Sequence, residues 1–161
     1  MIYNSLVKPL MFRLDAEQAH DAMHQFACKA SSNDLLKGLA RLIYNYQSPK
    51  LSQKLWGLPF RNPIGLAAGF DKNGHIPEIM EALGFGFIEI GSITGNPSTG
   101  NPKPRLFRLP RDRALINRMG LNNDGAKTIV KRLKNKNISI PLGINIAKTH
   151  DPNVMGDLAI R

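Results

Sequence analysis

The sequence is poor in cysteine, in aromatic residues and in long apolar runs. Cys28 is the only cysteine among 161 residues, which excludes a disulfide framework and a zinc site built from several cysteines. No run approaches the ~20 apolar residues that a membrane-spanning helix needs. Lys8, Pro9 and Arg13 interrupt the first apolar stretch, which is unlike a secretory signal. We therefore expect a chain that can lie on a membrane but does not cross one.

Acidic residues are also scarce, with 12 Asp and Glu against 22 Lys and Arg, so the net charge is +10. An excess of positive charge is typical of proteins that bind nucleic acid, anionic lipid or phosphorylated ligands. Nucleic-acid binding relies on aromatic side chains among the basic ones, and Phe107 is the only aromatic residue in the basic segment 103–136. We expect no nucleic-acid partner, and we interpret the basic helix predicted at 124–136 as the solvated outer face of an α/β fold.

Residues 1–47 have a helical pattern. A short apolar piece broken by Pro9 comes first, Asp15 is a plausible N-cap for a helix, and a second amphipathic helix follows the polar break at 31–34. Two interpretations stay open: a helical subdomain packed on the main body, or an interfacial hairpin whose Lys and Arg face lipid phosphates while Leu and Met enter the acyl chains.

Residues 48–161 have a different pattern. We predict buried strands at 64–68, 87–90 and 142–146, separated by helices at 77–83 and 124–136. A hairpin is predicted at 51–61, around Trp56-Gly57, a second hairpin or an excursion at 105–116, and a long loop at 91–104. Strand, helix, strand, helix, strand indicates a parallel α/β sheet.

Small or polar residues follow each predicted strand. Gly69, Asp71 and Lys72 come after the first, Ser92 after the second, and Asn145 and Lys148 at the end of the third. The carboxyl ends of parallel strands meet at one mouth, where α/β barrels keep their active sites. The segment 117–123 adds amide and guanidinium donors beside a glycine, which suits a small planar ligand with carbonyl and carboxylate groups.

Five ordered motifs resemble the dihydroorotate dehydrogenase family: Gly65–Gly74, Gly84–Thr94, Pro104–Leu109, Ile116–Gly120 and Leu142–Lys148. The segment Leu14–His20 resembles the quinone-dependent, membrane-associated class of that family. The resemblance implies an α/β fold: the N-terminal part of a TIM-type (β/α)8 barrel, preceded by a small α-helical subdomain. Residues 1–47 would form the membrane-associating and quinone-tunnel subdomain, and residues 48–161 the first part of the FMN-binding barrel.

The resemblance also implies the activity. Dihydroorotate would be oxidised to orotate in pyrimidine biosynthesis, with FMN as hydride acceptor and a quinone as the final electron acceptor. The protein would be peripheral to a membrane, on the cytoplasmic side of the cell membrane, or at the mitochondrial inner membrane in a eukaryote. No metal is implied.

Site residues carry over motif by motif. The resemblance places the cofactor against Ala67, Ala68, Gly69, Phe70, Asp71, Ser92 and Asn145. It places the substrate, dihydroorotate or orotate, against Lys72, Asn117, Arg118, Met119, Gly120 and Leu121. It assigns His20 and Arg108 to the lining of the quinone tunnel. Two residues depart from the family pattern: Leu121 where Phe is more common, and Gly95 where Pro commonly follows the Thr.

A complete barrel of this type needs roughly 250 residues. The resemblance implies that the loop with the catalytic serine base, a further flavin-contacting Lys and the loops that hold the FMN phosphate lie beyond Arg161. We therefore expect the 161-residue chain alone to be inactive. The alternative is a catalytically inactive remnant that acts at most as a membrane-surface or ligand-binding module.

Overall fold

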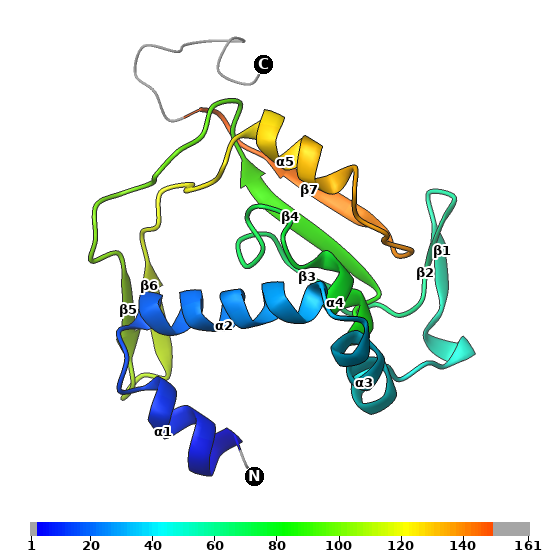
Figure 1. Ribbon diagram of the computed structural model, residues 1–161, viewed down its shortest axis with the longest axis horizontal. Helices are drawn as coiled ribbons and strands as arrows, with labels where there is room; N and C mark the ends of the chain where they lie inside the picture. Colours follow the sequence, from blue (N-terminus) through cyan, green and yellow to red (C-terminus); the bar gives the residue numbers. More distant parts are fainter. Residues whose placement is uncertain (1–2, 150–161) are drawn as a thin grey trace.

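The computed structural model describes residues 3–149, and this part of the chain begins with helices (Figure 1). They are a π-helical turn and three α-helices: Tyr3–Val7, α1 (Lys8–Met11), α2 (Ala16–Ser31) and α3 (Asp34–Tyr44). The predicted N-cap is confirmed, since the Asp15 carboxylate accepts hydrogen bonds from the backbone N–H of Glu17 and Gln18. The π-helical turn ends at Val7, and Pro9 lies in the first turn of α1, where proline has no N–H bond to lose.

Three parallel strands form the main sheet, which confirms the predicted α/β pattern. Their spatial order is β3 (Gly65–Leu66), β4 (Phe87–Ile93), β7 (Leu142–Ile146), and the intervening helices are α4 (Pro77–Ala82) and α5 (Ala126–Leu133). Parallel strands joined through helices are the repeating unit of an α/β barrel. The described residues therefore form part of such a barrel.

The two outer strands differ from the prediction. The strand predicted at 64–68 is confined to the two residues of β3, and both are partly exposed. β7 has the predicted bounds, but it is not buried: Ile144 is 48% and Ile146 66% exposed. Both strands lie at edges of the sheet, with no further strand beside them in residues 3–149. β4 extends to Ile93, into the predicted loop, because its pairing with β7 continues to Ile93, which lies opposite Ile146.

Both predicted hairpins are confirmed. They are antiparallel pairs: β1 (Gln53–Leu55) with β2 (Leu58–Phe60), and β5 (Leu106–Leu109) with β6 (Ala114–Asn117). A 3₁₀ turn (Pro49–Leu51) leads into the first. Trp56 and Gly57 make its tight turn, both with positive φ.

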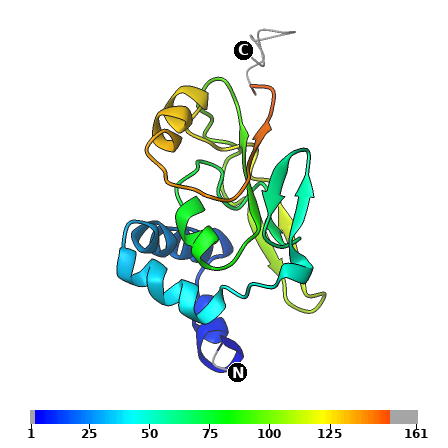
Figure 2. The same ribbon diagram turned by 90° about the vertical axis from the view of Figure 1, so that its right-hand side faces the viewer.

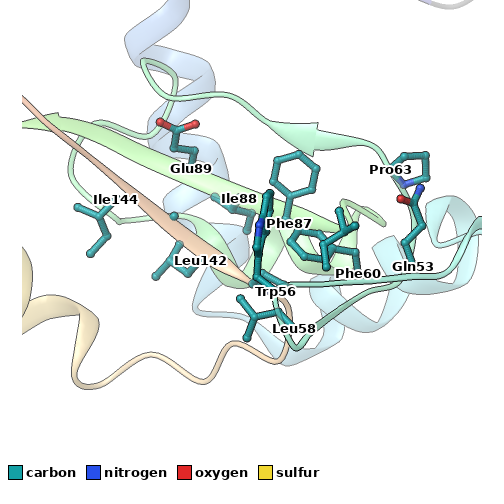
Figure 3. Close-up of a pocket in the computed structure, with 13 residues that line it drawn as sticks. Gln53, Trp56, Leu58, Phe60, Pro63, Phe87, Ile88, Glu89, Leu142 and Ile144 are labelled. Atoms are coloured by element: carbon teal, nitrogen blue, oxygen red, sulfur yellow. The ribbon is translucent and has the colours of Figure 1, made fainter.

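The core lies between the sheet and the helices on one of its sides, and the β1–β2 hairpin lies on the other side (Figure 2). Four isoleucines of this core are completely buried: Ile76, Ile88, Ile90 and Ile129. Between the hairpin and β4 and β7 is an open apolar pocket of about 520 Å³, where Trp56, Leu58, Phe60 and Phe87 gather (Figure 3).

The basic helix only partly fits the prediction of a solvated face. Lys127, Lys131 and Lys134 are exposed. In contrast, Arg132 donates to the Asp124 carboxylate at 2.7 Å, and the Lys136 ammonium lies 2.7 Å from the Glu78 carboxylate. Arg132 also donates to the Asn73 carbonyl, so these two side chains tie α5 and the chain after it to the rest of the fold.

Candidate active site

Two residues predicted to bind the cofactor are hydrogen-bonded to each other where β4 and β7 end. The Ser92 hydroxyl donates to Oδ1 of Asn145, and the Asn145 amide donates to Glu89 Oε1 at 3.0 Å. The register of β4 against β7 shifts between Ile90 and Ile93. A bulge of this kind re-aims a side chain, and here it turns Ser92 toward Asn145.

The predicted flavin loop, residues 67–72, lies against the same end of β4. The Gly69 N–H donates to the Gly91 carbonyl at 2.8 Å, and the Gly91 N–H donates to the Asp71 carbonyl at 3.2 Å. Gly69 has a φ of +106° and open space where a side chain would stand. Ala67 is exposed and Ala68 half-buried. Flat backbone without large side chains is therefore presented beside Ser92.

The Asp71 carboxylate points into the protein, away from the loop's open surface. It is completely buried, accepts from the backbone N–H of His75 and Ile76 (both 2.9 Å), and lies 3.7 Å from Nε2 of His24. Burial opposes ionisation, but the contact with His24 and the backbone donors outweigh it and lower the pKa of Asp71. Its side chain fixes the loop, so only its backbone can face a ligand.

A groove of about 540 Å³ joins the three predicted sets of residues. The cofactor set contributes Gly69 and Phe70, the substrate set Lys72, Asn117 and Met119, and the tunnel set His20 and Arg108. Apolar side chains of the N-terminal helices complete the wall: Val7, Met11, Phe12, Ala16, Ala19 and Met23. The groove thus runs between the N-terminal helices, the predicted flavin loop and the β5–β6 hairpin.

Lys72 and His20 line this groove, and both have lowered pKa values. The Lys72 ammonium donates to the Gly69 carbonyl at 2.7 Å, and burial together with the nearby Arg105 guanidinium lowers the pKa of Lys72. Burial and the charge of Lys72 lower the pKa of His20, whose ring meets the Phe70 ring edge-on at 5.5 Å. A cation and a weakly basic imidazole therefore share one apolar groove.

The predicted substrate loop is only partly in the groove. Asn117 and Met119 line it, and Asn117 Oδ1 accepts from the Met119 N–H at 2.8 Å. Arg118 is exposed and donates to the Pro104 carbonyl at 2.9 Å. Gly120 and Leu121 do not line the groove, and both have positive φ. They form the turn that leads back to the sheet.

Arg108, predicted to line the tunnel, holds the N-terminal helices in place. Its guanidinium donates to the carbonyls of Leu14 (2.7 Å) and Met11 (3.3 Å) and lies over the Phe12 ring at 4.7 Å. Its charge therefore satisfies carbonyl groups at the end of α1, where a cation is favourable.

Three important residues were not predicted. Glu17 on α2 is buried and binds the Arg105 guanidinium, with the closest oxygen at 2.7 Å from Nη2. His24 contacts the buried Asp71, and Glu89 holds Asn145. Each contact joins residues that are distant in sequence, so periodicity carries no signal for it.

Within residues 3–149, no helix combines the length and the apolar character needed to cross a bilayer. In the same part of the chain, no three His, Cys, Asp or Glu side chains are grouped so that they could hold a metal ion.

Comparison with known proteins agrees with the predicted resemblance. The family model for dihydroorotate dehydrogenase matches residues 50–158. A dihydroorotate dehydrogenase (quinone) of Gloeobacter violaceus is 50% identical over 145 residues, and one of Natronomonas pharaonis is 47% identical over 149 residues. The matches cover 89% of this chain but 40% and 41% of those proteins. The chain thus spans about two fifths of the length of these relatives.

Solved structures give the same result. A crystal structure of DHODH from Eimeria tenella in complex with ferulenol matches 82% of this chain with a TM-score of 0.67 and 41% identity, and the match covers 35% of that protein. The ligand-free form from the same organism matches 76% of the chain with a TM-score of 0.56 and 39% identity. The strand order, the ordered motifs and these matches lead to one assignment: the chain belongs to the dihydroorotate dehydrogenase family.

Proposed function

We propose that this chain is the N-terminal portion of an enzyme that oxidises dihydroorotate to orotate, with FMN as hydride acceptor and a quinone as final electron acceptor. One observation carries the proposal: a single groove is lined by Lys72 and Asn117 of the predicted substrate set and also by His20 and Arg108 of the predicted tunnel set. The relatives named above carry the same activity in their names.

The described residues fit a flavin. The open backbone at Gly69 offers a flat ligand close approach, and Ser92 and Asn145 offer polar groups beside it. We propose that the backbone of residues 67–71, together with Ser92 and Asn145, holds FMN, which supplies the capacity to accept a hydride. The protein's task is to orient the substrate and to set the charge around it.

We assign substrate recognition to Lys72 and Asn117. The Lys72 ammonium is a charged donor suited to the carboxylate of orotate, and the Asn117 amide suits the pyrimidine ring. Their neighbours Arg118, Met119, Gly120 and Leu121 shape the loop that carries Asn117. We expect the serine base in the region of the protein that corresponds to the uncovered part of its relatives.

We propose that the quinone enters between the N-terminal helices. The walls of the groove are mostly apolar, and the lowered pKa of His20 favours its uncharged form, which suits an uncharged ring.

Large apolar side chains are exposed on these helices: Tyr3, Leu6, Leu10, Leu35, Leu39, Leu42 and Ile43. Lys8, Arg13, Lys37 and Arg41 lie among them. This combination is typical of a membrane-surface segment, so we propose that residues 1–47 contact the membrane and residues 48–161 begin the flavin-binding barrel.

The test is to purify the native protein from its source and to measure its intact mass, its flavin absorbance and its dihydroorotate-dependent quinone reduction. We expect a mass well above 17.8 kDa, bound flavin and turnover, and no turnover by residues 1–161 alone. Vesicle binding without flavin at a mass of 17.8 kDa would instead support an inactive membrane-surface module. Tight flavin binding and steady turnover by the 161-residue chain would contradict our view that the base lies outside it.

A further inference from the structure

Glu89 carries a carboxylate that the proposed chemistry does not use. Its neighbours Ile88 and Ile90 face the core, so Glu89 lies on the opposite face of the sheet. It lies on β4, in register with Gly143 of β7. A Cβ at Gly143 would stand 3.4 Å from Cγ of Glu89, so the glycine leaves the carboxylate room. The side chain lies at one end of the apolar pocket, away from Trp56 and Leu58 (Figure 3).

From this position Glu89 reaches the residue diagonally across the strand pair. Side chains two residues apart on a strand share a face, so Gly143 and Asn145 share the face that Glu89 occupies. The Asn145 amide donates to Glu89 Oε1 at 3.0 Å, and the Ser92 hydroxyl donates to Asn145 Oδ1. The three side chains thus form one relay, Ser92 to Asn145 to Glu89.

The chemistry of the carboxylate sets the direction of this relay. A carboxylate only accepts hydrogen bonds, so Asn145 must turn its NH₂ toward Glu89 and its oxygen toward Ser92. The hydroxyl proton of Ser92 is then engaged in the hydrogen bond to Asn145, and only the lone pairs of the hydroxyl oxygen remain to bond a ligand. Asn145 keeps its second N–H.

We propose that Glu89 is a positioning residue that fixes Ser92 as an acceptor and Asn145 as a donor toward the ligand. The inference deepens the proposed function, on which it rests for the ligand. The ligand should therefore present a hydrogen-bond donor to Ser92 and a hydrogen-bond acceptor to Asn145. Adjacent groups on the edge of a flavin or pyrimidine ring provide this pair.

The relay itself can be tested without flavin. The side-chain amide ¹⁵N–¹H signals of Asn145 are recorded in the flavin-free native protein and in its E89L and E89Q variants. Glu89→Leu removes the acceptor, so the two amide protons should become similar in shift and exchange faster. Glu89→Gln offers an oxygen at the same place and should keep most of the wild-type pattern. Unchanged signals in E89L would overturn the relay.

The direction of the relay is tested by exchanging its two partners. N145D places two carboxylates together, and E89Q combined with N145D restores a hydrogen bond with the opposite direction. In the native protein we expect E89L and N145D each to weaken FMN binding roughly tenfold or more, as loss of a charge-assisted hydrogen bond does. The double variant should recover thermal stability but not FMN affinity.

Recovery of FMN affinity in the double variant would overturn the proposal, because the direction of the relay would then not matter. The exposed Ile144→Thr change on the other face of β7 is the matched control and should leave FMN affinity unchanged. If the Asn145 signals respond to E89L but the wild-type native protein binds no FMN, the relay stands and the proposed function fails.

Discussion

At the scale of single residues, Glu17 joins the N-terminal helices to the barrel. Its buried carboxylate is paired with Arg105, which also donates to the carbonyls of Thr99 (2.7 Å) and Asn101 (2.9 Å). Glu17→Ala would leave a buried guanidinium without its counter-charge, so we expect it to lower the free energy of unfolding by about 3 kcal/mol. Urea denaturation followed by circular dichroism measures this. Lys103, an exposed partner of Glu17, is the control: K103M should cost far less, and equal losses would contradict the assignment.

The same pair predicts a dependence of stability on pH. Hydrogen bonds from Arg105 lower the pKa of Glu17 below its ordinary 4.5, although burial opposes them. A lowered pKa in the folded state gives a contribution that is complete above the ordinary pKa and is lost as the pH falls through the folded value. The stability gap between wild type and E17Q should therefore be constant near neutral pH and shrink below about pH 4.5. A gap that widens with acid would refute this.

Lys72 supports a prediction about binding. A charged hydrogen bond contributes about 1.5–3 kcal/mol, so Lys72→Met should weaken orotate binding to the native protein roughly tenfold to hundredfold. Isothermal titration calorimetry measures the affinity directly. The matched control is Lys131→Met on the exposed face of α5, which should have no effect. An unchanged orotate affinity in K72M would remove Lys72 from the substrate site.

At the scale of elements, α3 leaves most of its apolar side chains exposed. Leu35 and Leu42 are 80% and 83% exposed, so replacing them should leave the fold intact. We expect the double variant L35D/L42D to reduce binding to anionic vesicles roughly tenfold or more, because each leucine loses the apolar surface it would bury. Co-sedimentation measures the bound fraction. Val130→Asp, at a half-exposed position of α5, is the control, and an equal loss there would indicate a charge effect only.

Several elements follow directly from local sequence. The Asp15 cap and the Trp56-Gly57 turn each depend on the backbone preference of a few adjacent residues, and each is where the sequence predicts it. Burial of β3 and β7 was predicted wrongly, because apolar runs indicate burial only when neighbouring elements cover them. The strand positions within the sheet, and not their composition, decide their exposure.

The sequence predicts which residues of the site follow the strands, but it does not predict the hydrogen bonds that join them. The positions of Ser92 and Asn145 after parallel strands indicate that they converge. Strict alternation from Glu89 would turn Ser92 toward the helices, and only the register shift between Ile90 and Ile93 brings it to Asn145. That shift depends on Gly91, whose φ is +109° and whose missing Cβ would stand 2.5 Å from the Asn145 carbonyl oxygen.

At the scale of the whole molecule, stability should be graded across the sheet. β4 has a strand on each side and its isoleucines are buried, whereas β7 has a neighbour on one side only in the described residues. We expect the amide protons of β4 to exchange most slowly and those of β7 and the β1–β2 hairpin much faster. Hydrogen exchange measured by mass spectrometry of the 161-residue chain tests this order. Equal protection of β4 and β7 would show that another segment covers the edge of the sheet.

The pairing of Glu17 with Arg105 also has a consequence for the timing of synthesis. The two residues are 88 positions apart, and a ribosome adds about 5–20 residues per second. Roughly 4 to 18 s therefore pass between the addition of Glu17 and that of Arg105. During this interval α2 and α3 have emerged or are emerging, while the contact that docks them does not yet exist. Their apolar faces are thus free to meet a membrane before the barrel begins to form.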